Sequence, residues 1–393
     1  MNYLNGFLRR GSLLLGLSLV SFSLWSCNQS GAPGGAPPSS LPLAVSPAAN
    51  YHADWSHQPA FVQNAIAVQG RHENDLLNIS GVIGDGVGLD HSNPNAAVIL
   101  VFTEHPGVAG IPEMLEGLKT QTEMVGPVTA YGYTGNYRTP LPAGVSVGDN
   151  DECAAGSIGA LVSTTRLTSS GSYTGTYEAT GNRNDVIHVY SAGYSWPSTV
   201  NSGTPAFMLS CNHVFANENA ATSADQQDQP GRYDNSCNTG NGVGKLYAWN
   251  YIDSHHNNYY DAALAECDPG LSGGWTPTMS PDAQYTPTNT VVSPSLDLSV
   301  QKVGRTTGYT NGTIAGINVT ITVGYTHFHA KFVDQIYIAS GTFIEAGDSG
   351  SMMVDGNDNP VGLNFAGSST ASFANRMDHI AHDFGLSFVT ASF

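Results

Sequence analysis

The sequence predicts a mainly β protein that begins with a small α/β unit. Two observations support this class. Only 11% of the 393 residues are charged, whereas glycine alone accounts for 45 residues, and such a composition is typical of a loop-rich β protein with frequent turns. The apolar residues also form short runs rich in Val, Ile and Thr that are separated by Gly, Pro and Asn, which is the pattern of strands joined by turns.

Residues 1–27 are typical of a targeting segment. Arg9-Arg10 precede an apolar stretch over 13–24, which is too short for a comfortable membrane span. The stretch leads into Leu-Trp-Ser-Cys, which resembles a bacterial lipobox and implies lipidation of Cys27. We therefore expect an exported protein of the cell envelope that is anchored through Cys27. The alternative is an ordinary secretory signal and a periplasmic or extracellular protein.

Four regions follow along the chain. Residues 28–50 are uncharged and rich in Gly, Pro, Ala and Ser, which indicates a disordered tether. Residues 51–133 mix helical and strand patterns and predict a small α/β domain. Residues 134–150 form a Gly/Pro-rich connector. Residues 151–393 carry most of the strand patterns and predict the main domain.

The element boundaries follow from hydrophobic periodicity. In the α/β domain, a helical period predicts a helix over 59–78, and Pro112 near its first turn predicts a short helix over 111–118. In the main domain, we expect a closing helix over 374–384 and a polar surface loop over 225–241. Strand patterns occur at 79–89, 96–102, 125–131, 155–162, 300–325, 335–338 and 360–366.

The sequence Gly347-Asp348-Ser349-Gly350 predicts a tight turn that presents a hydroxyl group. It lies between a β-type run and the apolar Met352-Met353-Val354. Glycine on both sides permits backbone angles that other residues avoid, and it leaves room for a substrate carbonyl beside the serine. The N–H groups of Gly347 and Ser349 can then point at one spot, where an oxyanion would form.

A serine nucleophile needs a base and an orienting carboxylate, and the sequence offers both. His213 closes the apolar run that contains Leu209-Ser210, and Asp261 opens the run Asp-Ala-Ala-Leu-Ala. Asp253 is a rival for the carboxylate, but it lies in a polar stretch. The order His, Asp, Ser and its spacing resemble those of the chymotrypsin-fold, or trypsin-like, serine peptidases, in a bacterial exported branch with an N-terminal α/β extension.

This resemblance covers about residues 151–393 and implies a fold and a mechanism. The implied fold is a double six-stranded antiparallel β-barrel behind the small α/β domain. Ser349 would be the nucleophile, His213 the general base and then acid, and Asp261 the group that orients the histidine. The implied activity is that of a serine endopeptidase that works through an acyl-enzyme, with Gly347 and Ser349 as the oxyanion hole.

The resemblance also implies a specificity pocket and an activation mechanism. Phe343 stands where relatives specific for Arg or Lys carry an aspartate, so we expect a preference for small or apolar residues. Asp348 corresponds to the aspartate that digestive relatives pair with a newly freed N-terminal ammonium. No basic cut site precedes the first barrel strand, so we expect internal donors for Asp348 instead. The implied backbone rail beside the pocket comprises Asn364, Phe365, Ala366 and Gly367.

The five cysteines are consistent with export. With Cys27 lipidated, four remain, which permits up to two disulfides in three possible connectivities. The four are Cys153, Cys211, Cys237 and Cys267.

Several other functions are disfavoured. A formal net charge of −18 opposes binding to nucleic acid. The histidine pairs His327/His329 and His379/His382 lack a third ligand and a water-activating carboxylate, so we expect neither a catalytic metal nor a cofactor. The expected partner is a protein or peptide substrate. The remaining alternatives are a binding or adhesion module that has lost turnover, and an esterase that uses the same three residues.

Overall fold

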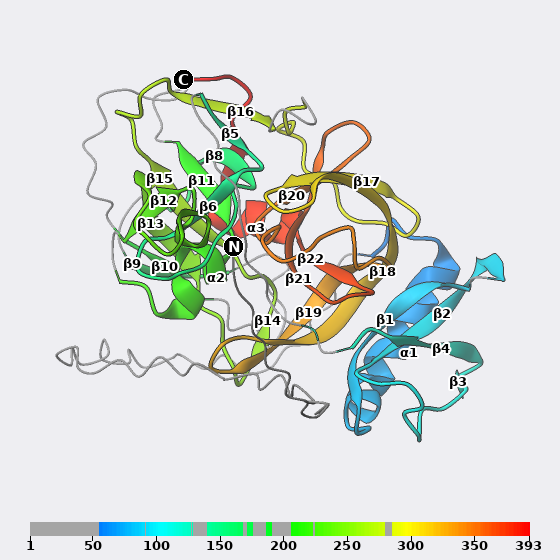
Figure 1. Ribbon diagram of the computed structural model, residues 1–393. Helices are drawn as coiled ribbons and strands as arrows, with labels where there is room; N and C mark the ends of the chain where they lie inside the picture. Colours follow the sequence, from blue (N-terminus) through cyan, green and yellow to red (C-terminus); the bar gives the residue numbers. More distant parts are fainter. Residues whose placement is uncertain are drawn as a thin grey trace, which may run out of the picture. The chain divides into compact units, whose positions relative to one another are not determined.

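The structure is a computed structural model that describes residues 55–90, 92–126, 128, 140–167, 171–175, 186–190, 206–222, 225–279 and 285–393 (Figure 1). The fold is mainly β, as predicted, and its strands form two curled sheets. The expected signal peptide with Cys27 and the expected tether lie outside the described residues. Among the described helices, none is both long enough and apolar enough to cross a membrane.

The first sheet closes into an antiparallel barrel. Its pairing runs β8-β11-β15-β13-β12-β6-β7, and β7 and β8 are consecutive in the chain, so the path returns to its start. β10 pairs with β13 and β9, and β23 pairs with β8. The strands are β6 (Ser146–Asp149), β7 (Gly156–Ser157), β8 (Ala160–Thr164), β9 (Gly171–Thr174), β10 (Val186–Val189), β11 (Phe207–Ser210), β12 (Gln226–Gln229), β13 (Asn241–Asn250), β15 (Ala263–Cys267) and β23 (Leu386–Phe388).

The second sheet contains a ring of six strands. The pairing runs β18-β19-β22-β21-β20-β17 and closes because β17 also pairs with β18. The double barrel is therefore confirmed. Helix α3 (Met377–Phe384) follows β22, which takes up the first residues of the helix predicted over 374–384. The strands are β17 (Ser299–Gly304), β18 (Gly308–Gly324), β19 (His329–Ile338), β20 (Met352–Asp355), β21 (Pro360–Gly367) and β22 (Ser372–Arg376).

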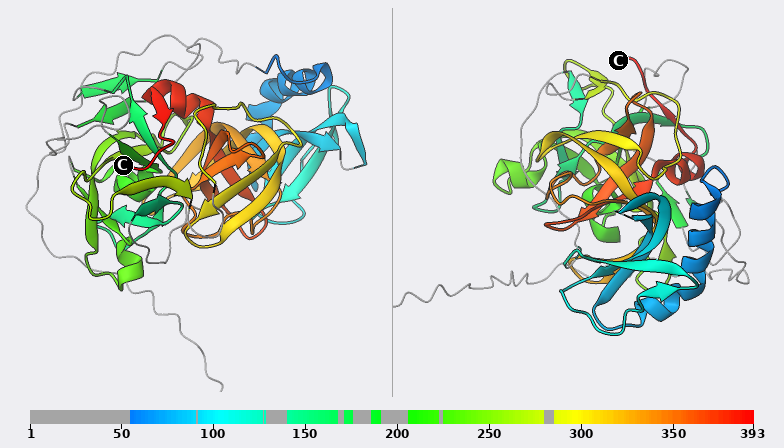
Figure 2. Two further views of the ribbon diagram at one scale, coloured as in Figure 1. Left: turned by 90° about the horizontal axis from the view of Figure 1, so that it is seen from above. Right: turned by 90° about the vertical axis from the view of Figure 1, so that its right-hand side faces the viewer.

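The N-terminal α/β unit continues the second sheet. β1 pairs with β18 in antiparallel register, with Gly84 opposite Ile321. A side chain at Gly84 would place its Cβ 2.3 Å from the Thr320 carbonyl oxygen, so this close pairing requires glycine. Helix α1 lies along β1 and β2 (Figure 2). The elements are α1 (Ala60–Leu77), β1 (Val82–Asp90), β2 (Asn93–Thr103), β3 (Met114–Leu115) and β4 (Leu118–Met124).

Two predictions in this unit are wrong. The helix predicted over 111–118 is instead a short hairpin of β3 and β4, because Glu116 and Gly117 both have positive φ, 48° and 87°, and form a two-residue turn. In the strand predicted over 125–131, Val125, Gly126 and Val128 lie in no strand and the other residues lie outside the described ones, while β4 ends at Met124 and pairs in parallel with β2. The residues of β4 are mostly polar and partly exposed, so they show no alternation of apolar residues that would predict a strand.

The remaining elements are short. Residues 141–149, within the expected connector, contribute β5 (Leu141–Ala143) and β6, and β5 pairs in parallel with β16 (Trp275–Met279). β14 (Asn257–Asn258) pairs in parallel with β19. The polar stretch 225–241 contains β12 as well as a turn of helix. The short helices are α2 (Asn212–Phe215) and the 3₁₀ turns η1 (Asn217–Asn219) and η2 (Arg232–Asn235).

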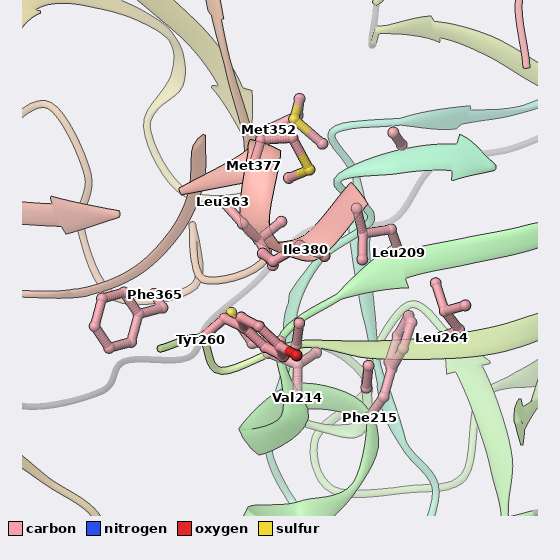
Figure 3. Close-up of a cluster of buried hydrophobic side chains, with 14 of the residues drawn as sticks. Leu209, Val214, Phe215, Tyr260, Leu264, Met352, Leu363, Phe365, Met377 and Ile380 are labelled. Atoms are coloured by element: carbon pink, nitrogen blue, oxygen red, sulfur yellow. The ribbon is translucent and has the colours of Figure 1, made fainter. Parts of the chain in front are cut away.

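The core continues from one barrel into the other. Leu209, Val214 and Phe215 of the first barrel belong to the same buried cluster as Leu363 and Phe365 of the second (Figure 3). α3 contributes to this cluster as well, through Met377 and Ile380. Burial of such side chains stabilises a fold by roughly 1.5–3 kcal/mol each. The shared core therefore holds together the elements that carry the candidate catalytic residues.

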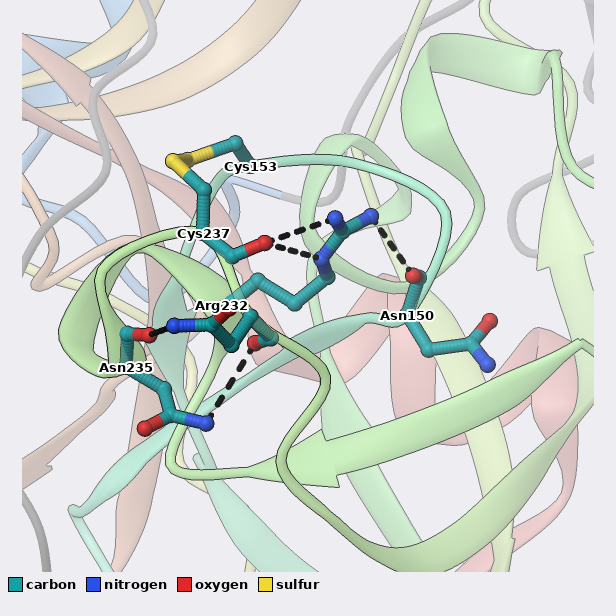
Figure 4. Close-up of a disulfide and its surroundings, with 6 residues drawn as sticks. Asn150, Cys153, Arg232, Asn235 and Cys237 are labelled. Carbon is teal, nitrogen blue, oxygen red and sulfur yellow. Dashed lines mark hydrogen bonds between the residues drawn. A yellow bond between two sulfur atoms is a disulfide. The ribbon is translucent and has the colours of Figure 1, made fainter.

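One disulfide forms among the four cysteines. Cys153 and Cys237 are bonded, with their Cα atoms 5.0 Å apart, and the link spans 84 residues of chain (Figure 4). Cys211 and Cys267 are free and buried, and burial raises the pKa of both thiols well above the ordinary value. The sequence permitted up to two disulfides, and the structure shows one, together with two buried, neutral thiols.

Candidate active site

The three predicted catalytic residues lie on elements that meet at the boundary of the two barrels. His213 lies in α2, directly after β11, and Asp261 lies just before β15. Ser349 lies in the turn between β19 and β20 of the second barrel. Ser157 of the first barrel holds this turn, because its N–H donates to the Ser349 carbonyl over 2.8 Å and its hydroxyl donates to the Gly347 carbonyl over 2.8 Å.

His213 and Asp261 form a close buried pair. Nδ1 of His213 lies 2.6 Å from Oδ2 of Asp261, and the His213 N–H donates to Oδ1 over 3.2 Å. The Tyr325 hydroxyl donates to Oδ2 over 2.8 Å, and the Asp261 N–H donates to the Asn375 side-chain oxygen. These contacts fix the ring of His213 and leave its Nε2 facing away from the carboxylate. Tyr325 and Asn375 both come from the second barrel.

The charge of Asp261 controls the protonation of His213. Burial alone would lower the pKa of His213, but the charge of Asp261 and its hydrogen bond outweigh that effect and raise the pKa above the ordinary value. Glu218 and Glu152 contribute to the same rise. Tyr325 remains a hydroxyl donor because burial, followed by the charge of Asp261, raises its pKa well above the usual range.

The Ser349 hydroxyl and His213 are not hydrogen bonded to each other. Oγ of Ser349 donates to the Phe365 carbonyl over 3.2 Å, and Nε2 of His213 is buried with no partner among the described residues. For the serine to pass its proton to Nε2, the hydroxyl must leave the Phe365 carbonyl. The His213–Asp261 pair is thus already formed, while the Ser349 hydroxyl is bound to a carbonyl of its own barrel.

The turn around Ser349 has the backbone shape that its glycines allow. Gly347 and Gly350 have positive φ of 102° and 87°. A Cβ on Gly350 would lie 2.1 Å from the Ser210 hydroxyl, so only glycine fits there. Within the described part of the chain, the N–H groups of Gly347 and Ser349 donate to no protein acceptor. Both donors are therefore available to a ligand oxygen.

Asp348 is held by internal donors, as predicted. Lys302 Nζ lies 3.2 Å from its Oδ2, and both side chains are fully buried. The Thr307 hydroxyl donates to Oδ2 over 2.6 Å and the Glu345 N–H over 2.9 Å, while the Thr306 N–H donates to Oδ1 over 2.8 Å. Burial lowers the pKa of Lys302, and the charge of Asp348 opposes that shift. An N-terminal ammonium is not needed to balance this carboxylate.

The residues expected around a specificity pocket are buried in the second barrel. Phe343 belongs to a hydrophobic cluster with Val300 and Ile338, and its carbonyl accepts the Thr310 hydroxyl over 2.6 Å. All of β21 is buried. The Asn364 amide donates to Ser351. β21 therefore carries the residues of the expected rail: Asn364, Phe365, Ala366 and Gly367.

Other expected or possible site residues take different positions. Asp253, the rival of Asp261, accepts the N–H groups of His255 and His256 within its own exposed loop. A metal-like set of Cys211, His213 and Asp261 lies within 4.8 Å, but it belongs to the site just described. Its thiol is neutral and donates to the Asn364 carbonyl over 3.4 Å, so it is a poor metal ligand.

Sequence reasoning missed Lys302, Tyr325 and Asn375. Lys302 lies inside the strand pattern of 300–325, and a single cation in such a pattern predicts an exposed residue. In the structure, Lys302 is instead buried against Asp348. Tyr325 ends the same run, and nothing local links it to Asp261. The available signal was an ionisable residue in an otherwise apolar strand, which requires a partner when it is buried.

Comparisons with known proteins find only distant likeness. No protein-family model and no curated protein matches the sequence. The solved structure of Thermobifida fusca Protease A is 15% identical, with a TM-score of 0.39 over 64% of this chain and 99% of that chain. Nocardiopsis protease gives the same values. A glutamic acid-specific serine protease is 13% identical, with a TM-score of 0.38 over 63% and 100%. The fold assignment therefore rests on the strand pairing of this chain.

Proposed function

We propose that this chain is an exported serine endopeptidase that hydrolyses peptide bonds through an acyl-enzyme. The observation that carries the proposal is the buried His213–Asp261 pair. His213 lies in α2, beside the Ser349 turn, and its Nε2 has no partner among the described residues. Export is supported by the Cys153–Cys237 disulfide, and lipidation at Cys27 extends the same proposal.

In the proposed mechanism, Ser349 attacks the scissile carbonyl and His213 Nε2 takes the hydroxyl proton. Asp261 keeps the tautomer with hydrogen on Nδ1 and stabilises the imidazolium that forms. The N–H groups of Gly347 and Ser349 receive the developing oxyanion, and each such donor lowers a barrier by roughly 3–4 kcal/mol. His213 then returns the proton to the leaving amine, and water releases the acyl group by the same steps in reverse.

Substrate selection is proposed to favour small or apolar side chains. Phe343 and its neighbour Ile344 are both buried and uncharged, so a cationic side chain bound beside them would lack a partner. A peptide library that varies the residue before the scissile bond measures this preference. Strong cleavage after Arg or Lys would contradict it.

Labelling with a fluorophosphonate probe tests the nucleophile. We expect the wild type and Ser369→Ala to react, because Ser369 is exposed outside the proposed machinery, and Ser349→Ala to remain unlabelled. Peptide cleavage then separates a peptidase from an esterase. Absence of labelling in a folded wild type would favour the alternative, a binding or adhesion module without turnover. The hydrogen bond from the Ser349 hydroxyl to the Phe365 carbonyl is the observation that favours this alternative.

A further inference from the structure

A group of carboxylates lies outside the candidate active site, where β6 pairs with β12. Asp149 is the last residue of β6, Asp151 follows two residues later, and Asp225 directly precedes β12. One carboxylate oxygen of each residue lies within 4.8 Å of those of the other two. Three like charges at such distances repel one another unless a proton or a cation intervenes.

No lysine or arginine of the described residues balances this group. Within the described residues, none of the three aspartates forms an ion pair with lysine or arginine. The nearby Arg232 donates to backbone carbonyls instead, to Asn150 over 2.9 Å and to Cys237 over 2.7 Å (Figure 4). Among the described residues, the hydrogen bonds to these carboxylates are local, and one of them comes from the Thr222 hydroxyl to Oδ1 of Asp225. The Asp151 N–H donates to Oδ1 of Asp149 over 2.9 Å, and the Thr222 N–H donates to Asp225 over 2.7 Å.

The second oxygen of Asp149 is the independent sign of a ligand. Asp149 is only 3% exposed, yet its Oδ2 is buried with no hydrogen-bond partner among the described residues. Burying a carboxylate oxygen without a partner costs several kcal/mol. This buried oxygen lies in a group of three aspartates and therefore needs a partner that no described residue supplies.

We propose that Asp149, Asp151 and Asp225 bind a calcium ion. All donors of the group are carboxylate oxygens, which suits a hard cation and disfavours zinc or copper. Calcium accepts six to eight oxygen ligands in irregular geometry and so fits donors from two strand ends, with water completing the shell. Magnesium demands a near-ideal octahedral geometry and loses its water reluctantly, so it is the weaker candidate. The ion would join the end of β6 to the start of β12, close to the disulfide at Cys153.

The test titrates calcium chloride into chelator-treated full-length protein, followed by calorimetry and thermal unfolding. We expect saturable binding and a rise in Tm of at least about 2 °C at saturation, because the ion binds the folded state. Asp149→Asn should abolish both effects. Asp151→Asn should weaken affinity at least about tenfold, and because Asp151 is exposed this variant folds. The control Asp75→Asn, a carboxylate with 85% of its side chain exposed, should bind as the wild type does.

Three results would overturn the proposal. The first is no binding by the wild type at about 10 mM calcium, well above the range of extracellular sites. The second is unchanged affinity in both Asp149→Asn and Asp151→Asn, which would place the ion elsewhere. The third is tighter binding of magnesium than of calcium. If Asp149→Asn does not fold, the comparison of Asp151→Asn with Asp75→Asn decides.

Discussion

Two buried carboxylates of the candidate site, Asp261 and Asp348, are stabilised in different ways. Asp261 faces an imidazole at 2.6 Å and a tyrosine hydroxyl at 2.8 Å, and it has no lysine or arginine partner among the described residues. Asp348 faces the buried ammonium of Lys302 and accepts bonds from Thr306, Thr307 and Glu345. The first carboxylate faces an imidazole, which changes its charge in the proposed reaction, and the second faces an ammonium group, which takes no part in that reaction.

This difference matches the tasks proposed for the two sides of the site. The His213 side must gain and lose a proton in each turnover, so its carboxylate needs a titratable partner. The Ser349 turn must keep its N–H groups aimed at one point throughout, so a buried ion pair and several backbone donors suit it. The comparison predicts that substitutions on the first side act on rate and that substitutions on the second side act on stability.

The largest expected effect is on the rate. Asp261→Asn should lower kcat by about 10⁴-fold because the amide favours the wrong tautomer of His213, while the protein remains folded. Kinetics on a peptide substrate and circular dichroism measure the two outcomes. Asp253→Asn is the matched control and should keep near-normal activity. A larger loss of kcat in the Asp253 variant would show that Asp253, and not Asp261, orients His213.

Lys302→Met should act mainly on stability. Removing the ammonium leaves Asp348 buried without its charge partner, which costs about 3–5 kcal/mol of unfolding free energy. Urea unfolding measures the loss. Lys119→Met is the control, because Lys119 is 56% exposed in its ion pair with Asp90 and should cost at most about 1 kcal/mol. Equal losses in the two variants would show that the buried pair has no special role.

Tyr325→Phe should have an intermediate effect on rate. It removes one hydrogen bond to Asp261, worth about 1.5 kcal/mol or roughly tenfold in kcat/KM, and preserves the ring packing. Tyr309→Phe, at an exposed hydroxyl that contacts Gln301, serves as the control and should leave kcat/KM unchanged. Identical kinetics of the Tyr325 variant and wild type would mean that this donor does not support the pair.

The dependence of kcat/KM on pH should report His213. Its pKa is raised above 6.5, so the imidazole is protonated and inactive as a base below that pKa. Activity should therefore rise with pH, and the midpoint of the rise should lie above 6.5. A midpoint below 6.5 in the free enzyme would contradict the dominance of Asp261 over burial.

The smallest expected effect concerns the N-terminal unit. Since Lys302 already balances Asp348, the protein with residues 51–133 attached should be active toward a small peptide, and cutting the chain before Leu141 should change this activity little. The cut must precede β5 and β6, because a chain trimmed to Asn150 loses a strand of the first barrel. Activity that appears only after cutting would make the unit an inhibitory propeptide.

The sequence was sufficient for features that are encoded locally. Helix α1, the long β18 and the nucleophile turn follow from periodicity and glycine placement, and they occur near the expected positions. The helix predicted over 111–118 was wrong. Pro112 suggested a helix start, but the turn at Glu116-Gly117 produces the β3–β4 hairpin instead. Propensity is a weak guide when a two-residue turn competes with it.

Contacts between distant segments could not be predicted. Tyr325 reaches Asp261 across 64 residues, and Lys302 reaches Asp348 across 46. The choice of Cys237 as the partner of Cys153 likewise depends on how the barrel closes. Such pairings are properties of the tertiary fold, and a single sequence contains no local pattern that specifies them.

The pairing of β1 with β18 has a consequence for handling the protein. A strand edge that loses its neighbour exposes a row of unpaired N–H and C=O groups that another molecule can occupy. The segment Ile317–Ile321 of β18, bounded by two buried isoleucines, is covered by β1 along one side. A protein shortened to begin after the N-terminal unit would uncover this apolar edge, and its principal defect would be self-association during refolding and storage.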